Sequence, residues 1–386
     1  MQIFKTPNFN FMRYKLYAFG LSGILIIAGL INISVGKGIT PGIDFAGGAL
    51  IQARFIDPIS IAELRQTLGV PELKGVKIQE VEKENREYMI RAMVPEGEAG
   101  QELEAHVILA ERVVELLRTE QDRQNQQTGR KDLNYIDISE IIPILQSEFP
   151  DQALEFAQTI LDIKESDSQK GILENYDQLA VPELSPEALT LIKENTYLGS
   201  LAVKRRETVG PQVGSDLRRR ATQATVWALI GMLIYIGIRF RFAYGVAAIL
   251  TLAHDVLITM GIFSLTNREV NLPVIAAILT IVGYSLNDTI VIFDRVRDNI
   301  KLLRKHDFET ILDSSINQTL SRTAITSGTT FLTVLALFLF GGPVINDFAF
   351  TMMIGVVIGT YSSIYQSCSL LFYWNKILKP KKGLGK

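Results

Sequence analysis

Two acidic side chains lie inside long apolar stretches of the sequence, where charged groups are rare. Asp288 stands in GYSLNDTIVIFDRVRDN, two residues after the end of the apolar run LPVIAAILTIVGYSL, and Asp255 follows His254 in LAHDVLI. An acid near the centre of a membrane helix costs about 2.5 to 3.5 kcal/mol on insertion scales, which offsets several Leu or Ile residues. Acids at such positions mark ion or proton pathways, or they tie helices together by hydrogen bonds.

A cation accompanies these acids. Arg322 lies at one end of the fifth apolar stretch, in LSRTAITSGTT, and the start of this stretch can reach the membrane depth at which Asp288 lies. The same stretch carries hydroxyl side chains that would support a purely structural role, at Thr326, Ser327, Thr329 and Thr330. Both interpretations stay open at this point, for Asp288 with Arg322 and for His254 with Asp255.

Six stretches of about 20 mostly apolar residues are long enough to cross a hydrocarbon core of roughly 30 Å. The chain has 386 residues, of which 47% are apolar, and a formal net charge of -2. This composition is typical of a protein that is part membrane and part soluble. The predicted spans are Leu16–Val35, Thr222–Ile238, Phe242–Leu265, Leu272–Phe293, Thr323–Phe340 and Phe348–Trp374. The sequence therefore predicts a multi-pass α-helical membrane protein with six transmembrane helices.

The basic residues of the tails and short connections predict the orientation of these spans. Residues 1–36 comprise the N-terminal tail and the first span, and residues 376–386 form the C-terminal tail. Lys and Arg gather in these two tails, between the second and third spans, and after the fourth span. These four places share one side of a six-span chain, so the positive-inside rule predicts that both termini are cytoplasmic. The first span is preceded by Lys5, Arg13 and Lys15, as in a signal peptide. Its length and the lack of an A-x-A-like cleavage site instead predict a retained anchor.

The long segment between the first two spans, residues 37–220, predicts a folded domain on the outer side of the membrane. It opens with GIDFAGGALIQARF, in which Gly42, Gly47 and Gly48 allow positive φ where a membrane helix turns into a strand. Ser60 to Glu63 form a capping box, and GVKIQEVEK and REYMIRAMV alternate as the strands of a hairpin. Together with a helix in residues 101–118 and a last strand in GSLAVKRRETVG, the order β-α-β-β-α-β predicts a ferredoxin-like α+β domain.

Extra material at about residues 122–196 enlarges this domain. The stretch QDRQNQQTGRKD is polar throughout and predicts a loop, whereas YIDISEIIPILQSEF and DQALEFAQTILDI have helical periodicity. Ser185 and Pro186 predict the N-cap and first residue of another helix. No His, Cys or acidic cluster has ligand or catalytic spacing, and Cys368 is the single cysteine. The sequence predicts a helical insertion and neither a metal site nor a cofactor.

Several long motifs, in order along the six spans, resemble those of the SecD/SecF family of protein-export membrane proteins, part of the resistance-nodulation-division (RND) superfamily. The resemblance is to the smaller, SecF-type members, and it covers roughly residues 37–94 and 199–373. The motifs are GIDFAGG, ETVGPQVGSDLRRRA, LAHDVLITMGIFSL, GYSLNDTIVIFDRVRDN, INQTLSRTAITSGTT and LFLFGGPVINDFAFTMMIGVVIGTYSSIY. Their structural positions in the outer domain are Gly42, Asp44, Gly47, Gly48, Gly210, Pro211 and Gly214. The insertion departs from the family's usual outer domain.

This resemblance implies a membrane motor component rather than an enzyme. It implies work with SecD beside the SecY, SecE and SecG channel, with YajC and YidC as further partners, in the bacterial cytoplasmic (inner) membrane. The ligand would be an unfolded exported polypeptide, with no nucleic acid. The resemblance assigns proton conduction to Asp288 and Arg322. Asp255 and His254, which are ionisable residues within the third span, and Asn287 beside Asp288 are further candidates for the proton pathway. In chemical terms, burial favours a neutral carboxyl and a nearby cation favours the anion, so a balanced site loads and releases a proton with modest rearrangement.

Two other classes of function fit the same spans. Six helices with a large outer loop after the first are also half of an RND transporter, which would export a small molecule or a lipid. A structural membrane scaffold without proton coupling would tolerate Asn in place of Asp288. The motif resemblance favours protein export over both.

Overall fold

The computed structural model describes residues 7–36, 38–71, 73–81, 86–93, 104–166 and 168–378, and these fall into two compact units. The first unit combines the chain up to Gly42 with the chain from Arg218 onward, and the second runs from Ile43 to Leu217. The helix α9 (Pro211–Arg239) begins in the second unit and continues into the first.

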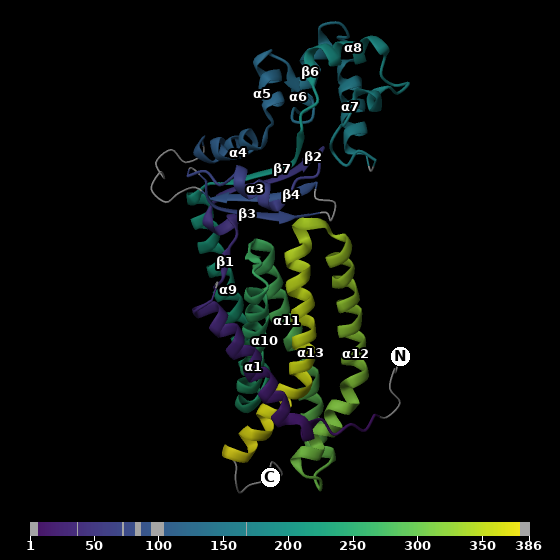
Figure 1. Ribbon diagram of the computed structural model, residues 1–386. Coiled ribbons are helices and arrows are strands. Elements are labelled where there is room, and N and C mark those ends of the chain that lie inside the picture. Colours follow the sequence, from purple (N-terminus) through teal and green to yellow (C-terminus); the bar gives the residue numbers. More distant parts are fainter. Residues whose placement is uncertain are drawn as a thin grey trace. The chain divides into compact units, whose positions relative to one another are not determined.

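Six helices of the described chain are long and apolar enough to cross a membrane, as the sequence predicts (Figure 1). A short 3-10 helix, η1 (Phe11–Tyr14), leads into the first of them. The six are α1 (Lys15–Ser34), α9, α10 (Phe242–Leu265), α11 (Leu272–Leu302), α12 (Phe308–Phe340) and α13 (Gly342–Leu378). Two short strands of this unit, β1 (Thr40–Pro41) and β8 (Glu269–Val270), pair in parallel.

The fourth and fifth spans are longer as helices than their apolar stretches. The basic residues after the fourth span were predicted to occupy a loop, but Arg295, Arg297 and Lys301 lie within α11. Charged residues such as Arg and Lys have good helix propensity, so a helix can continue beyond its apolar part. The turn that follows ends where the Asp307 side chain caps α12 by accepting from the Thr310 backbone N–H at 3.2 Å.

Small residues allow pairs of membrane helices to approach closely. A Cβ added to Gly29 of α1 would lie 2.6 Å from the Cα of Gly261 on α10. On α13, a Cβ at Gly355 would overlap Ile281 of α11, and one at Gly359 would lie 3.3 Å from Ser285 Cβ. Such close backbone approach is the usual role of small residues in membrane helix packing. The GxxxG spacing from 355 to 359 therefore marks the contact of α13 with α11.

The second unit contains a four-stranded antiparallel sheet in the order β3-β4-β2-β7. Its strands are β2 (Gly48–Phe55), β3 (Lys74–Glu80), β4 (Glu87–Met93) and β7 (Leu201–Val209). The helices α3 (Ile61–Thr67) and α4 (Glu104–Leu117) share a core with the sheet, and the predicted capping box of Ser60 with Glu63 opens α3. The element order and strand order are those of the predicted ferredoxin-like domain.

The glycines of the GIDFAGG motif have different roles. Gly47 and Gly48 adopt φ of 76° and 132°, and Gly214 lies against the first of them, with a built Cβ 3.3 Å from Gly47 N. The positive φ predicted for Gly42 is wrong, because Gly42 is outside the left-handed region. Its N–H instead donates to Val270 O at 2.7 Å, and a Cβ there would lie 3.2 Å from the same oxygen. The lack of a side chain at Gly42 thus lets its backbone come close to that of Val270. The short helix α2 (Ile43–Ala46), which includes Asp44, follows Gly42.

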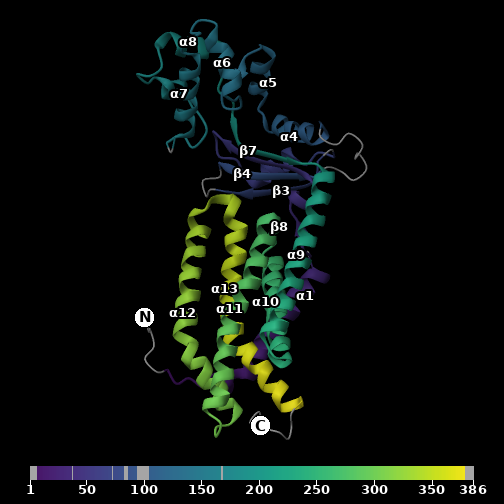
Figure 2. The same cartoon turned by 180° about the vertical axis from the view of Figure 1, so that it is seen from behind.

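The insertion has a hydrophobic core of its own, separate from that under the sheet. Its elements are α5 (Glu120–Gln127), β5 (Lys131–Asp132), α6 (Ile138–Gln146), α7 (Ala153–Glu165), η2 (Tyr176–Leu179), α8 (Pro186–Asn195) and β6 (Thr196–Tyr197) (Figure 2). Ser185 caps α8 and Pro186 begins it, as predicted.

The loop predicted for QDRQNQQTGRKD is wrong over most of its length, because it forms α5. Thr119 and Asp122 form a reciprocal capping box at the start of this helix. Asp122 is 4% exposed, and its carboxylate also accepts from the backbone N–H of Ser200 at 3.2 Å. One buried capping acid therefore stabilises a helix that has no apolar residue.

Candidate functional site

Asp255 is the centre of a buried polar network in the membrane unit. Its side chain lies in the middle of α10 and is fully enclosed. The carboxylate accepts hydrogen bonds from Ser285 Oγ on α11 and from Ser362 Oγ on α13, the latter at 2.8 Å. The imidazole Nδ1 of His254 lies 2.8 Å from the other carboxylate oxygen. Every strong contact of this acid is thus with another polar side chain, as a buried charge requires.

His254 extends the network to α1. Its Nε2 lies 2.7 Å from Ser22 Oγ, and Gln366 of α13 donates to the same hydroxyl at 2.6 Å. The hydroxyl of Tyr361 lies 3.2 Å from Ser22 Oγ and donates to the backbone oxygen of Ala18 at 2.8 Å. The network therefore links four helices, α1, α10, α11 and α13, through one carboxylate and one imidazole.

α1 and α10 run parallel, and three contacts between them align Ser22 with His254. Ser22 meets His254, Gly29 meets Gly261, and Asn32 Nδ2 donates to Ser264 Oγ at 2.8 Å. The two partners are 232 positions apart in both hydrogen bonds, and the glycine pair keeps the same offset. Contacts repeated at steps of seven and three residues lie on one face of each helix. The glycine crossing lies between the two hydrogen bonds along both helices.

Asp288 forms a second and looser site. Its side chain on α11 is 3% exposed. Ser327 of α12 donates to one carboxylate oxygen at 3.3 Å, and the neighbouring Asn287 side chain donates to the other at 3.4 Å. Both contacts are longer than a strong hydrogen bond to a carboxylate. Asp288 is therefore buried almost as completely as Asp255 but is held much less firmly.

The two acids are connected through α11. Ser285 and Asp288 are three residues apart, so they lie on one side of the helix with about 4.5 Å of rise between them. Ser285 points to Asp255, and Asp288 points to Ser327. A rotation or shift of α11 would thus change both sites together.

Two buried hydroxyls close to Asp288 in the helices have no hydrogen-bond partner among the described residues. These are Thr289, the next residue on α11, and Thr323, one turn from Ser327 on α12. An unpaired buried hydroxyl is costly and is commonly a place where water or a moving group binds. Thr323, four residues before Ser327, lies on the same face of α12 as the serine that contacts Asp288, so this face has a further hydroxyl near the acid.

Arg322 is the predicted partner of Asp288, and the two are not in direct contact. The arginine is exposed on α12, and within the described chain no ion pair or hydrogen bond joins it to the Asp288 carboxylate. It acts on that carboxylate electrostatically, through space. The pair predicted from the sequence is therefore near but unformed.

The sequence identified the acids but missed most of their partners. Asp255, His254, Asp288 and Asn287 all belong to buried polar contacts, in two adjacent sites. The missed residues are hydroxyl and amide side chains in apolar spans: Ser22, Ser285, Tyr361, Ser362 and Gln366. Ser362 and Gln366 are four residues apart in the polar run YSSIYQSCS, a spacing that could have indicated a buried face. Across the described residues no group of three or more His, Cys, Asp or Glu side chains could hold a metal ion.

Comparison with known proteins connects these sites to a family. A family model for the protein export membrane protein SecD/SecF, C-terminal part, matches residues 190–377, and a SecD/SecF GG motif model matches residues 33–55. The protein translocase subunit SecF of Koribacter versatilis is 36% identical over 384 residues, which cover 96% of this chain and 93% of that relative. The subunit SecF of Escherichia coli O157:H7 is 32% identical, with coverage of 94% and 86%.

A solved structure of the same family has a similar fold. The crystal structure of SecDF from Thermus thermophilus, described as a translocon-associated membrane protein, matches with a TM-score of 0.64 and 31% identity. The match covers 96% of this chain and 39% of the SecDF chain, so this chain corresponds to a part of that longer protein.

Proposed function

Because the chain belongs to the SecD/SecF family of protein-export membrane proteins, we propose that it is the SecF-type subunit of a bacterial protein translocase. In this role it works with SecD to complete the export of preproteins through the SecY, SecE and SecG channel, using the proton-motive force. YajC and YidC are further proposed partners. The proposed location is the cytoplasmic (inner) membrane, with both termini in the cytoplasm. The chain is proposed to move polypeptides and to catalyse no reaction.

The buried and loosely held carboxylate of Asp288 carries this proposal. A proton carrier must exchange its proton, so its hydrogen bonds have to be weak enough to rearrange. The contacts of Asp288 at 3.3 and 3.4 Å fit this need, and Arg322 on α12 is the proposed cation that stabilises the carboxylate when the proton leaves. The membrane potential contributes about 2.3 kcal/mol per charge per 100 mV, which is enough to bias two arrangements of α11 and α12 by a factor of tens.

The network around Asp255 supports a different role for that acid. Its contacts are short and come from several helices, which favours the structural of the two interpretations. We assign Asp255 and His254 to holding α1, α10, α11 and α13 in register, and Asn287 to orienting Asp288. Export of a small molecule or lipid gains no support, since the full-length relatives are named as translocase subunits.

Replacement of Asp288 by Asn tests the proton-carrier role. The amide keeps the shape of the site. Its oxygen still accepts from one of Ser327 and Asn287, and the contact that is lost is a long one, so the protein should assemble with SecD, but the side chain has no group that titrates. Completion of export of a trapped intermediate is measured in membrane vesicles after ATP is exhausted, with and without an imposed proton gradient. We expect the gradient-dependent part to disappear and ATP-driven export to persist.

Arg322→Lys is the companion variant, because it keeps the charge and loses the planar guanidinium. Partial loss of gradient-driven export is expected. Full gradient-driven completion by assembled Asp288→Asn protein would contradict the assignment and return Asp288 to a structural role.

A further inference from the structure

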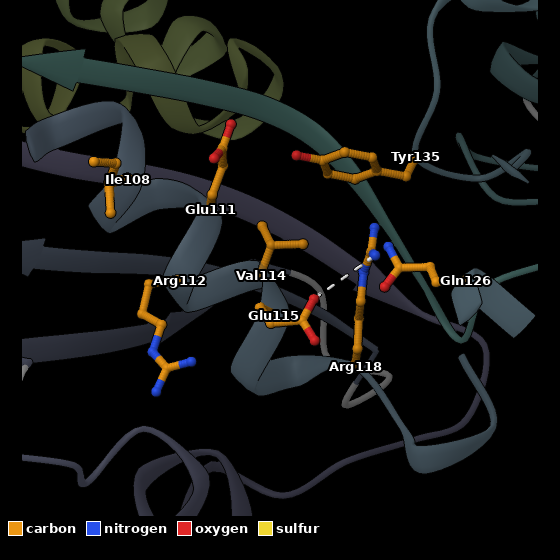
Figure 3. Close-up of a pocket in the computed structure, with 8 residues that line it drawn as sticks. All are labelled: Ile108, Glu111, Arg112, Val114, Glu115, Arg118, Gln126 and Tyr135. Atoms are coloured by element: carbon orange, nitrogen blue, oxygen red, sulfur yellow. Dashed lines mark ion pairs between the residues drawn. The ribbon is translucent and has the colours of Figure 1, made fainter. Parts of the chain in front are cut away.

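A hollow of about 440 Å³ lies beside the last turns of α4 in the second unit. Figure 3 shows the side chains around it, which come from α4, from Gln126 on α5 and from Tyr135 after β5. The remaining lining residues, all on or directly after α4, are Ile108, Glu111, Arg112, Val114, Glu115 and Arg118. This volume is within the usual range of ligand pockets.

Arg118 is the unusual group in this hollow. Its side chain is 6% exposed, yet it makes no hydrogen bond to any described residue. The nearest acidic oxygens, on Glu115 and Asp132, lie at 3.8 and 3.9 Å, which is beyond hydrogen-bond distance. Glu115 lies closer to Arg123, at 3.4 Å. Both terminal nitrogens are thus in long ion pairs and neither is hydrogen-bonded to a described residue, so a carboxylate that came closer would improve the pairing of this buried cation.

The guanidinium is already oriented for a ligand. Its carbon lies 4.9 Å from the centre of the Tyr135 ring, a cation–π contact that fixes the plane of the group. Nε is enclosed, which leaves the two terminal nitrogens, each in a long ion pair, as the donors available to a ligand. Two parallel donors in a fixed plane match the two oxygens of a carboxylate.

The rim of the hollow restricts which anion can enter. Glu111 and Glu115 lie one turn apart on α4 at its edge and would repel a polyanion such as a phosphate ester or nucleic acid. Apolar surface is available beside them, since Ile108 is 60% exposed. A ligand with a single carboxylate meets less repulsion from the two glutamates than a polyanion, and apolar groups beside that carboxylate can contact Ile108. An acidic residue within a polypeptide has this chemistry.

The neighbouring strand favours a polypeptide in extended form. β7 is the terminal strand of the four-stranded sheet, and terminal strands are the usual places where an extended chain adds. Its Arg206 reaches the same hollow: one Nη lies 3.5 Å from Glu111, and the other donates to the Tyr135 hydroxyl at 3.3 Å.

We propose that this hollow binds an extended segment of the exported polypeptide through one acidic side chain, with Arg118 as the carboxylate receptor and Ile108 and Tyr135 as apolar walls. The occupant rests on the proposed function. The carboxylate chemistry rests on the geometry of the hollow.

Peptide binding to the full-length protein in nanodiscs tests the proposal. The probes are two fluorescent peptides of Leu, Ser and Thr that differ at one central position, Glu or Gln. The Glu peptide should bind at least about tenfold more tightly, as expected for a charge-assisted pair of hydrogen bonds. Arg118→Gln should abolish this preference. Arg65→Gln, an exposed change on α3, is the matched control and should leave it intact.

Ile108→Glu keeps Arg118 and changes an exposed position, so it tests the site even if Arg118→Gln is unstable. The added charge at the rim should weaken binding of the Glu peptide selectively, by about tenfold. Equal affinities for the two peptides, a preference that survives Arg118→Gln, or displacement by millimolar inorganic phosphate would each overturn the proposal. The binding assay needs no proton gradient, so its failure is distinguishable from failure of gradient-driven export in Asp288→Asn.

Discussion

Replacing Gly29 by alanine should separate α1 from α10 and break the link from α1 to the Asp255 network. The new Cβ would lie 2.6 Å from the Cα of Gly261, whereas carbon atoms in contact are about 3.5 to 4.0 Å apart. The helices must therefore move apart by about 1 Å at this crossing. Gly23 is a matched control on the same helix, because a Cβ there meets nothing within 4 Å.

The expected cost follows from the contacts on both sides of the crossing. A shift of about 1 Å takes the His254–Ser22 and Asn32–Ser264 distances from 2.7 and 2.8 Å past the limit for a hydrogen bond. Each lost bond between membrane helices costs about 0.6 kcal/mol, and overpacking costs about 1 to 3 kcal/mol. Gly29→Ala should thus be about 2 to 4 kcal/mol less stable than Gly23→Ala, since both gain the same helix propensity.

Unfolding in SDS, followed by the fluorescence of Trp227 and Trp374, measures this difference in purified protein. Gradient-driven export in vesicles is measured in parallel and should fall in Gly29→Ala alone. A Gly29→Ala protein as stable as Gly23→Ala, within about 0.5 kcal/mol, would refute the idea that this crossing sets the lengths of the two hydrogen bonds.

Two further predictions concern pH and topology. Burial raises the pKa of Asp132 to about 6 from 3.8, against the opposing effect of Arg118. Between these values the folded state binds more protons than the unfolded state, so the second unit should lose about 3 kcal/mol of stability as the pH rises from about 4 to about 6. Hydrogen exchange of this unit, corrected for its intrinsic pH dependence, should show the loss in the wild type and not in Asp132→Asn. In a Cys368→Ser background, an impermeant maleimide outside intact cells should label Val344→Cys, which is exposed in the wild type, and spare Lys305→Cys; the opposite pattern would invert the proposed orientation.

The sequence was sufficient where one local rule determined the structure. Apolar length predicted all six membrane helices, and alternation with turn residues predicted the strands whose order proved ferredoxin-like. The Ser60 and Ser185 caps were predictable because capping involves residues three positions apart. At α5 the same local signal, Thr119 with Asp122 three positions on, was overlooked, and what the sequence could not show is the contact of Asp122 with Ser200, 78 positions away.

The candidate site shows the same limit. The cost of charge in a membrane identified Asp255 and Asp288 as important, but it could not say which acid is firmly held. That difference comes from serines on other helices: Ser285 and Ser362 donate to Asp255, whereas within the described chain only Ser327 donates to Asp288 from another helix. A serine in an apolar span carries little signal in the sequence, because its hydroxyl can bond to its own helix. The pairing required the three-dimensional packing.

Asp255→Asn separates the two roles that an intramembrane acid can have. The wild-type carboxylate offers one oxygen to Ser285 and Ser362 and the other to His254 Nδ1. An amide can keep its oxygen on the two serines, but its NH₂ group then faces Nδ1, so the imidazole must carry its proton on Nε2. The hydrogen bonds that remain are made to a neutral amide and are about half as strong as those to a carboxylate, which should cost about 1 to 3 kcal/mol in total.

Asp255→Asn should therefore lower stability and gradient-driven export together, and export should recover in part at lower temperature. Asp288→Asn replaces an acid whose contacts are 3.3 and 3.4 Å long, so export should stop while stability is unchanged. SDS unfolding and vesicle export, measured on both variants at two temperatures, give this comparison. A fully stable Asp255→Asn protein that has lost gradient-driven export at every temperature would show that Asp255 carries protons, because a residue that only holds helices cannot stop export without weakening the fold.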